Sequence, residues 1–195
     1  MTSSRPDIAF DVTKLSQFLV NPGGAHWKAV KRVMRYLKGT LDYKINYGGG
    51  DLNLVGFSDA DYAGDQDTRR STTGKVFNLN GGPVLWSTSE QKSVALSTCE
   101  AEYMALASAA KDTVWLRRLL GDIGVLNGSA TVVYTDNQGA EKLVRNPEFH
   151  QRTKYIDVRY HFIREQEAAG VLRVMFTPTD EQPADMLTKS LSGPV

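Results

Sequence analysis

Cysteine is nearly absent from this sequence, which contains Cys99 and no other cysteine among 195 residues. A single thiol can neither close an intramolecular disulfide nor supply the paired cysteines of a zinc finger. Long apolar runs are also absent, and residues 1–4 lack the charged-then-apolar pattern of a signal peptide. We therefore expect an intracellular protein with no membrane partner.

A surplus of charge of one sign is missing as well. Lys and Arg number 23 and Asp and Glu number 22, which gives a formal net charge of +1 at pH 7. Net charge therefore favours no class of partner, and any nucleic-acid surface has to come from local clusters of cations. The densest cluster is a helical stretch at 28–38, where Lys and Arg crowd around a face formed by Trp27, Val30, Met34 and Leu37.

The triple glycine at 48–50 is the best candidate boundary within the chain. Residues 1–50 are predicted to form a helix that Pro6 opens, a second helix that Gly39 ends, and a strand at 43–47. Beyond the boundary, the pattern predicts strands at 52–59, 74–79, 84–87, 131–135 and 172–177, and helices at 99–122, from 138, at 156–168 and from 183. This order of elements predicts a mixed sheet with helices packed on it.

Two aspartates follow apolar strands, where a solitary ionised carboxylate is costly to bury. Asp59 shares a strand face with Val55 and Phe57, and Asp136 comes after Val132 and Tyr134. These positions indicate a shared cation. An equally good explanation from the pattern alone is that each aspartate caps the turn that follows its strand.

The helix predicted at 99–122 begins with two glutamates, Glu100 and Glu102, whose positions in the helix indicate different roles. Residues 97–100 (STCE) form a capping box, in which Ser97 is the N-cap and Glu100 reaches back to its amide. Glu102 instead lies on the stripe of small and apolar residues that should face the sheet. Glu102 is therefore the better candidate for a buried functional acid, although interaction with the helix N-terminus also explains it.

Asp185 lies in the first turn of the last predicted helix, where an acid that complements the helix dipole is the simpler explanation. Together with Asp59, Glu102 and Asp136, it could nevertheless complete one carboxylate site. Hard oxygen ligands of this kind suit Mg²⁺ or Mn²⁺. Such a site supports phosphodiester hydrolysis with two metal ions.

Six blocks of the sequence, in this order, resemble the ribonuclease H of copia-type retrotransposon polyproteins. They are 56–65 (GFSDADYAGD), 71–74 (STTG), 96–103 (LSTCEAEY), 134–137 (YTDN), 156–165 (IDVRYHFIRE) and 182–189 (QPADMLTK). Residues 5–8 (RPDI) and 26–30 (HWKAV) resemble the segment that connects reverse transcriptase to ribonuclease H in these polyproteins. The resemblance covers nearly the whole chain, and six ordered blocks are far more specific than a single motif.

The resemblance implies an α/β fold of the ribonuclease H-like type, with a mixed five-stranded sheet and helices on both faces. Residues 1–50 would be the connection segment that follows reverse transcriptase, and 51–195 the ribonuclease H domain. The implied activity is endonucleolytic hydrolysis of the RNA strand of RNA–DNA hybrids during reverse transcription. The implied partners are the hybrid and the reverse transcriptase domain of the same polyprotein, in a cytoplasmic virus-like particle or the nucleus.

The resemblance also implies an Asp-Glu-Asp-Asp site that holds two Mg²⁺ or Mn²⁺ ions. Carried over by position, the four acids are Asp59, which should bridge both metals, Glu102, Asp136 and Asp185. Asp61 is an alternative to Asp59, because strand alternation only roughly determines which of the two faces inward. The loop at 177–182 lacks the histidine that cellular ribonucleases H often carry before the fourth acid, and we expect slower turnover as a result.

Binding of a hybrid needs cations that lie over phosphates and polar groups that contact the backbone. The candidates for this surface are Arg69, Arg70, Ser71, Thr72, Asn137, Arg152 and Lys154. An ordinary solvated surface explains each of the cations equally well.

Two other functions compete with hydrolysis of hybrids. The first is a catalytically silent ribonuclease H-like module that binds nucleic acid and derives from a decayed or domesticated element. The second is another nuclease or strand-transferase of the same superfold, such as an integrase. The presence of all four acids argues against the first, and the order of the blocks, with 184–187 (ADML) last, argues against the second.

Overall fold

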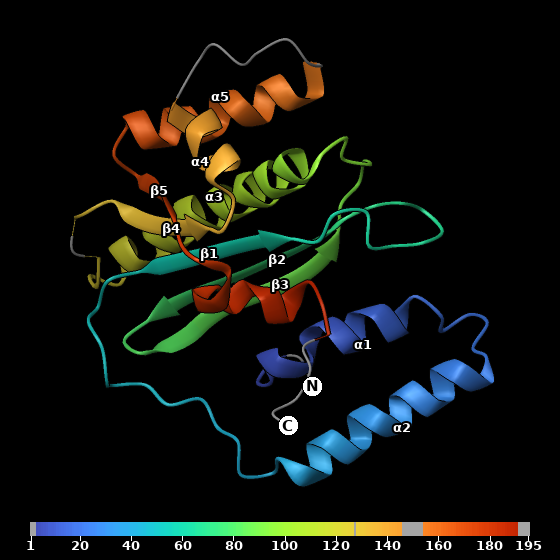
Figure 1. Ribbon diagram of the computed structural model, residues 1–195. Coiled ribbons are helices and arrows are strands. Elements are labelled where there is room, and N and C mark those ends of the chain that lie inside the picture. Colours follow the sequence, from blue (N-terminus) through green and yellow to red (C-terminus); the bar gives the residue numbers. More distant parts are fainter. Residues whose placement is uncertain (1–2, 127, 146–153, 191–195) are drawn as a thin grey trace.

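The structure, a computed structural model, describes residues 3–126, 128–145 and 154–190, with the backbone alone for 154–160 (Figure 1). A five-stranded sheet in the order β3-β2-β1-β4-β5 forms its centre. The strands are β1 (Val55–Ala60), β2 (Thr72–Leu79), β3 (Gly82–Glu90), β4 (Thr131–Thr135) and β5 (Leu172–Phe176). β1, β2 and β3 pair antiparallel, whereas β1, β4 and β5 pair parallel. The predicted mixed sheet is confirmed.

Helices cover both faces of this sheet, as expected. The long helix α3 (Thr98–Asp122) packs on one face, with α4 (Gln138–Arg145) and α5 (Lys154–Ala168) beside it (Figure 1). The short 3-10 helix η4 (Pro183–Leu187) and helix α1 (Ala9–Ser16) pack on the other face. Two neighbouring residues of β2 show the division: Phe77 joins the core beneath α3, and Val76 joins the core beneath η4.

Helix α3 forms because its sequence suits both its start and its buried face. Ser97, in extended conformation, caps the helix by accepting a hydrogen bond from the Glu100 amide at 3.2 Å. Small residues allow a close approach to the sheet, and Ala101, Ala105 and Ala109 are fully buried. The helix therefore holds the residues of its first turn firmly against the ends of β1 and β4.

The hairpin between β2 and β3 turns at Asn80 and Gly81, which both have positive φ angles, of 52° and 83°. An Asn-Gly pair with two positive φ angles is typical of a type I′ hairpin turn. The chain at 46–50 runs beside this turn, where the Gly48 amide donates a hydrogen bond to Asn80 O at 2.9 Å. The predicted hairpin is confirmed.

The strand predicted at 43–47 is wrong. This segment is irregular and pairs with no strand of the sheet. A strand needs a neighbour that accepts and donates backbone hydrogen bonds along its length, and the sequence pattern of one segment cannot supply that neighbour.

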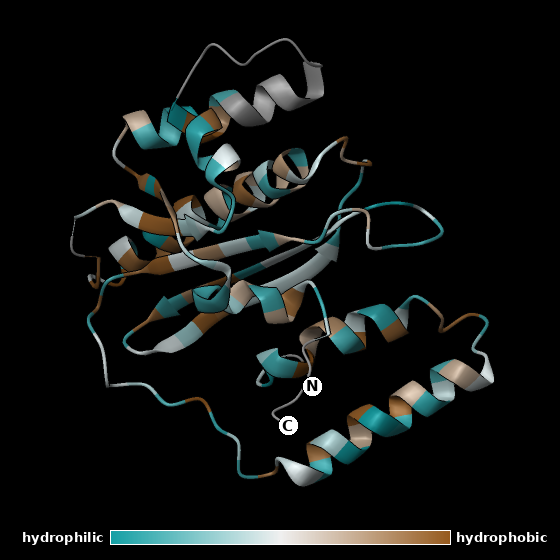
Figure 2. Ribbon diagram, viewed as in Figure 1, coloured by the Kyte–Doolittle hydropathy of each residue, from teal (hydrophilic) through white to brown (hydrophobic). Residues whose placement is uncertain are grey.

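The N-terminal part contains η1 (Pro6–Ile8), α1 and α2 (Gly24–Gly39), and the predicted end of the second helix at Gly39 is confirmed. Ile8 and Ala9 are only 1% and 3% exposed, because they pack where α1 meets η4. Helix α2 has no buried residue and lies apart from the sheet, with hydrophobic and hydrophilic residues alternating along it (Figure 2). The N-terminal part is thus anchored through α1.

The C-terminal helix predicted from Pro183 is shorter than a helix of ordinary length. It consists of η4, which follows another 3-10 turn, η3 (Thr179–Glu181). Pro183 occupies the start of η4, as expected for a residue without an N–H group. The turn places Ala184 and Leu187 in the core beneath β2.

Candidate active site

The two strand-end aspartates meet because their strands are parallel neighbours. Phe57 of β1 is paired with Tyr134 of β4, so that the register continues toward Asp59 and Asp136, two residues further along each strand. Carboxyl ends of parallel strands lie at the same edge of a sheet. Both side chains therefore come to one edge of the sheet.

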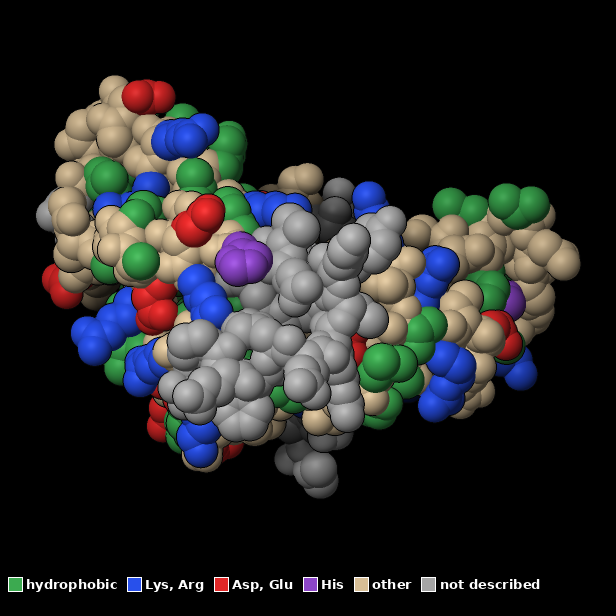
Figure 3. All heavy atoms as spheres, turned by 90° about the horizontal axis from the view of Figure 1, so that it is seen from above, with side chains coloured by type: hydrophobic (Ala, Val, Ile, Leu, Met, Phe, Trp, Pro, Cys, Tyr) green, Lys and Arg blue, Asp and Glu red, His purple; other side chains and the backbone are tan. Residues whose placement is uncertain are grey.

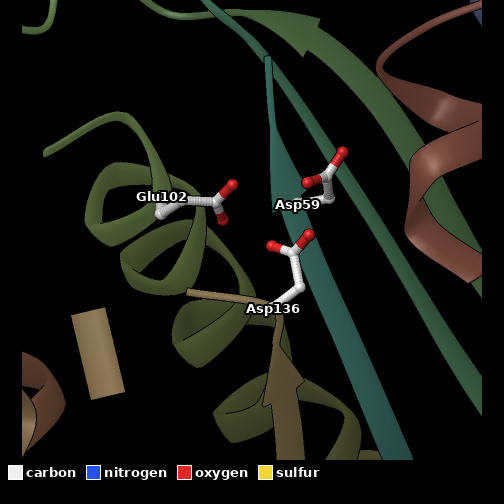
Figure 4. Close-up of side chains that lie close together, drawn as sticks. All are labelled: Asp59, Glu102 and Asp136. Carbon is white, nitrogen blue, oxygen red and sulfur yellow. The ribbon is translucent and has the colours of Figure 1, made fainter. Parts of the chain in front are cut away.

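Glu102 reaches the same place from the first turns of α3. Its Oε1 accepts a hydrogen bond from the backbone amide of Ala60, at the end of β1, at 3.2 Å. Asp59, Glu102 and Asp136 each offer a carboxylate oxygen, and these oxygens lie within 4.8 Å of one another. Figure 4 shows the three side chains pointing toward one another from β1, α3 and the end of β4.

Burial and like charge make this cluster electrostatically costly when no cation is bound. Asp59 is 4% exposed and Glu102 is 6% exposed. Burial, together with the charges of Asp185 and Asp136, raises the pKa of Asp59 to about 6, although the Thr188 hydroxyl and Lys189 oppose this rise. Burial and the charges of Asp59 and Asp136 raise the pKa of Glu102 to about 9.

The arrangement fits a divalent cation. Glu102 Oε2 and Asp185 Oδ1 are buried oxygens without a hydrogen-bond partner among the residues that the structure describes, and a buried carboxylate oxygen normally has one. A cation would satisfy these oxygens and offset the repulsion between the carboxylates. The donor set, which contains oxygen ligands alone, favours a hard cation over a soft one.

Asp185 lies beside this cluster but is not one of the three residues whose oxygens converge. It is 8% exposed and belongs to η4. Its charge nevertheless acts on Asp59, whose pKa it raises. One of its oxygens, Oδ2, is 2.6 Å from the Nζ of Lys189.

The two alternative acids have structural roles. Asp61 accepts a hydrogen bond from the Thr72 amide and closes the loop between β1 and β2. A Cβ atom at Gly64 would clash with the Asp61 carboxylate, so that a side chain there would have to displace it. Glu100 Oε2 accepts a hydrogen bond at 2.9 Å from the Leu96 amide, where the sequence predicted the amide of Ser97. Both carboxylates thus accept hydrogen bonds from backbone amides.

Of the described residues that were expected to contact nucleic acid, three make hydrogen bonds within the fold or are buried. Ser71 is fully buried and its hydroxyl accepts a hydrogen bond from the Ala63 amide at 3.0 Å, and Thr72 is also buried. Asn137 Oδ1 accepts a hydrogen bond from the Ala140 amide at 3.0 Å and caps α4. Arg152 and the side chain of Lys154 lie outside the described residues.

Arg69 and Arg70 remain as cations at the surface. Arg69 is exposed and has a positive φ of 57°, whereas Arg70 is bound to Glu90, with 3.2 Å between Nη1 and Oε2. Seen from above, Lys and Arg side chains lie scattered among Asp and Glu side chains on both sides of the grey atoms (Figure 3).

Three residues near the acids were not singled out in the sequence. The buried Thr188 hydroxyl donates a hydrogen bond to Asp59 Oδ2, and the Thr179 hydroxyl donates one to Asp136 Oδ2 at 2.8 Å. Lys189 contacts Asp185. Asp185 and Lys189 are four residues apart, a spacing at which opposite charges commonly pair, and this signal could have identified Lys189.

The fold matches those of solved ribonucleases H. LC11-RNase H1, solved in complex with an RNA/DNA hybrid, has a TM-score of 0.52 and 16% sequence identity, over 70% of this chain and 94% of that chain. The N-terminal RNase H domain of rv2228c from Mycobacterium tuberculosis has a TM-score of 0.50 and 16% identity, over 71% of this chain and 91% of that chain. The chain therefore has a fold of the ribonuclease H-like class.

Sequence comparison gives close relatives, although no family model matches the chain. The Retrovirus-related Pol polyprotein from transposon TNT 1-94 of Nicotiana tabacum is 50% identical over 189 residues, which are 97% of this chain and 14% of that protein. That from transposon RE2 of Arabidopsis thaliana is 45% identical over 190 residues, 97% of this chain and 13% of that protein. Close homologues of this chain are thus retrovirus-related Pol polyproteins of copia-type transposons, and the chain spans about one seventh of their length.

A shorter relative is the Secreted RxLR effector protein 161 of Plasmopara viticola, which is 51% identical over 117 residues, 60% of this chain and 82% of that protein. Sequences of this kind thus also occur in proteins much shorter than a Pol polyprotein. In the part of the chain that the structure describes, no helix is long and apolar enough to cross a membrane.

Proposed function

We propose that this chain is an endonuclease that hydrolyses the RNA strand of RNA–DNA hybrids during reverse transcription of a retrotransposon. The observation that carries the proposal is the convergence of the Asp59, Glu102 and Asp136 carboxylates at one edge of the sheet. Buried acids of like charge are costly, and they are found together where a cation binds. The family and the ribonuclease H fold support this reading of the site.

Two Mg²⁺ or Mn²⁺ ions are the proposed cofactors, and Asp59, Glu102, Asp136 and Asp185 would hold them. When bound, such ions lower the pKa of a water molecule and stabilise the charge on the leaving oxygen. The protein's own part is to position the acids. The Ala60 amide orients Glu102, the Thr188 hydroxyl holds Asp59, and the Thr179 hydroxyl holds Asp136.

The proposed partner is the RNA–DNA hybrid, with the reverse transcriptase domain of the same polyprotein as the source of that hybrid. Arg69 and Arg70, which lie on the loop between β1 and β2, would contact phosphates. Helix α2 adds a second basic surface, because residues 24–39 contain five Lys and Arg residues and no acid. Phosphate contacts of this kind supply affinity without reading sequence.

We also propose the division of the chain into a connection segment, 1–50, and a ribonuclease H domain, 51–195. The segment is anchored by Ile8 and Ala9 and by an ion pair between Lys14 and Asp65, with 3.7 Å between Nζ and Oδ2. The proposed location is that of reverse transcription, a virus-like particle or the nucleus.

A cleavage assay with a hybrid whose RNA strand is labelled tests the function. Mg²⁺ or Mn²⁺ should support cleavage of that strand, and duplex DNA should stay intact. Equal cleavage in excess chelator would contradict the proposal. Tight binding of hybrid without cleavage at any metal concentration would favour the catalytically silent module, and joining of DNA strands would favour an integrase-like activity.

A further inference from the structure

Lys189 lies two residues after the end of η4, and its ammonium contacts the fourth acid. The Nζ atom is 2.6 Å from Asp185 Oδ2, with the Lys189 side chain 48% exposed and the Asp185 side chain 12% exposed. A short contact between an ammonium group and a buried carboxylate is a charge-assisted hydrogen bond, which is stronger than one between neutral groups. Lys189 thus brings a fixed positive charge to the edge of the acidic cluster.

The contact leaves the other oxygen of Asp185 free. Among the described residues, buried Asp185 Oδ1 has no hydrogen-bond partner, so that Lys189 binds one oxygen of the carboxylate and the other oxygen stays buried. The residue before it, Thr188, holds Asp59. Two consecutive residues therefore hold two of the four acids from the end of η4.

We propose that Lys189 is a positioning residue of the acidic site, which orients Asp185 and competes with a divalent cation for it. The inference rests on the proposed function, because it requires that the acids bind metal. A cation that takes both oxygens of Asp185 has to displace the ammonium, and one that takes Oδ1 alone is repelled by it. In the absence of metal, the same ammonium offsets part of the repulsion between the carboxylates.

Two effects of removing this charge follow, and they have opposite signs. Lys189→Gln should bind Mn²⁺ more tightly, on the order of tenfold, because a nearby positive charge is removed, with allowance for screening by solvent. In excess chelator the same variant should melt at a lower temperature than the wild-type protein, because the Lys189 ammonium no longer offsets the repulsion between the carboxylates. Lys189→Arg keeps the charge and should behave like the wild-type protein in both measurements.

The experiment measures Mn²⁺ affinity by calorimetry and Tm with Mn²⁺ or chelator, on the full chain. Lys111→Gln, at an exposed lysine on α3, is the matched control and should change neither quantity. In an Asp185→Asn background, Lys189→Gln should no longer change Mn²⁺ affinity, because the competition is for that carboxylate.

Each outcome decides between the two proposals. Equal Mn²⁺ affinity and equal Tm in chelator for the wild type and Lys189→Gln would overturn the role of Lys189 and leave the metal site standing. A wild-type protein that binds no Mn²⁺ would overturn the proposed metal site, and the competition with it. Tighter binding by Lys189→Gln that persists in the Asp185→Asn background would show a general charge effect and also overturn the inference.

Discussion

The backbone amide of Ala60 donates a hydrogen bond to Glu102 Oε1 at 3.2 Å, which joins the end of β1 to the start of α3. This hydrogen bond orients one oxygen of Glu102, while its other oxygen, Oε2, is buried and has no hydrogen-bond partner. Glu100, two residues earlier on the same helix, instead accepts a hydrogen bond from the Leu96 amide. The two glutamates therefore differ in role although they are close in sequence.

The first prediction compares these two glutamates. Glu102→Gln keeps the shape of the side chain and removes its charge, so that cleavage should fall by orders of magnitude while the fold is retained. Glu100→Gln should change little, because an amide oxygen can also accept from the Leu96 amide. Glu100→Ala should cost about 0.5–2 kcal/mol of stability, by analogy with the removal of helix caps. Hybrid cleavage and thermal melting of the three variants test this prediction. An inactive Glu100→Gln beside an active Glu102→Gln would show that Glu100, and not Glu102, belongs to the site.

The second prediction concerns the strand-end aspartates. Asp59→Asn and Asp136→Asn should each abolish cleavage, and in excess chelator each should raise Tm, because one of the clustered charges is removed. Asp180→Asn, at an exposed aspartate of η3, is the control and should leave both quantities unchanged. Full activity of Asp136→Asn would place the site elsewhere.

The third prediction is a dependence of metal-free stability on pH. The folded-state pKa values of Asp59 and Glu102 are raised to about 6 and about 9, so the folded protein retains protons that the unfolded chain releases near pH 4. This contribution is fully present below about pH 4 and is lost as pH rises through about 6 and about 9. In chelator, Tm should therefore fall between pH 5 and pH 9.

Variants and metal separate this effect from other titrations. Glu102→Gln should flatten the upper part of the pH profile, because the group that titrates near pH 9 is gone. Saturating Mn²⁺ should flatten it as well, because a bound cation favours the ionised carboxylates. A wild-type Tm that rises with pH in chelator would contradict the pKa shifts.

The fourth prediction tests the basic surface of α2. Replacing Lys28, Lys31 and Lys38 by Gln should weaken hybrid binding and lower the salt slope by about one for each phosphate that the protein no longer neutralises. Cleavage at saturating hybrid should be unchanged. A triple variant at exposed cations of α3 and α4, with Gln at Lys111, Arg118 and Lys142, is the control. Equal salt slopes for the two triple variants would remove α2 from the binding surface.

The fifth prediction concerns the connection segment. A protein that begins at Asp51 lacks Ile8 and Ala9, which cover the core beneath η4, and should melt at a lower temperature than the full chain. Ala9→Glu in the full chain should lower Tm in the same direction, because it buries a charge among Val76, Ala184 and Leu187. Unchanged melting of both proteins would show that 1–50 is not anchored to the domain.

Local pattern was enough for β4 and α3, the elements that position Asp136 and Glu102. The predicted strand at 131–135 has the observed bounds, and the helix predicted at 99–122 begins one residue earlier. The alternation of apolar residues and the cap at Ser97 are local signals, so they can be recognised from the sequence alone. The same local signals predict Asp59 and Asp136 at strand ends and Glu102 on a buried helix face without information from tertiary contacts.

Other features depended on contacts that the local sequence does not contain. Residues 43–47 have the composition of a strand but meet no partner strand. Ser71 and Thr72 are polar, yet the loop that Asp61 closes carries them into the interior.

The sequence by itself determined the α/β class and the resemblance to copia-type Pol polyproteins, because periodicity, caps and ordered motifs are properties of short segments. It also predicted four acids for the site. Only the tertiary structure decided which acids converge and what holds them. The Thr188 hydroxyl donates a hydrogen bond to Asp59, which is 129 positions away in the sequence, and the Ala60 amide donates one to Glu102, which is 42 positions away. Such contacts are made by the pairing of strands and the packing of η4, and no local pattern encodes them.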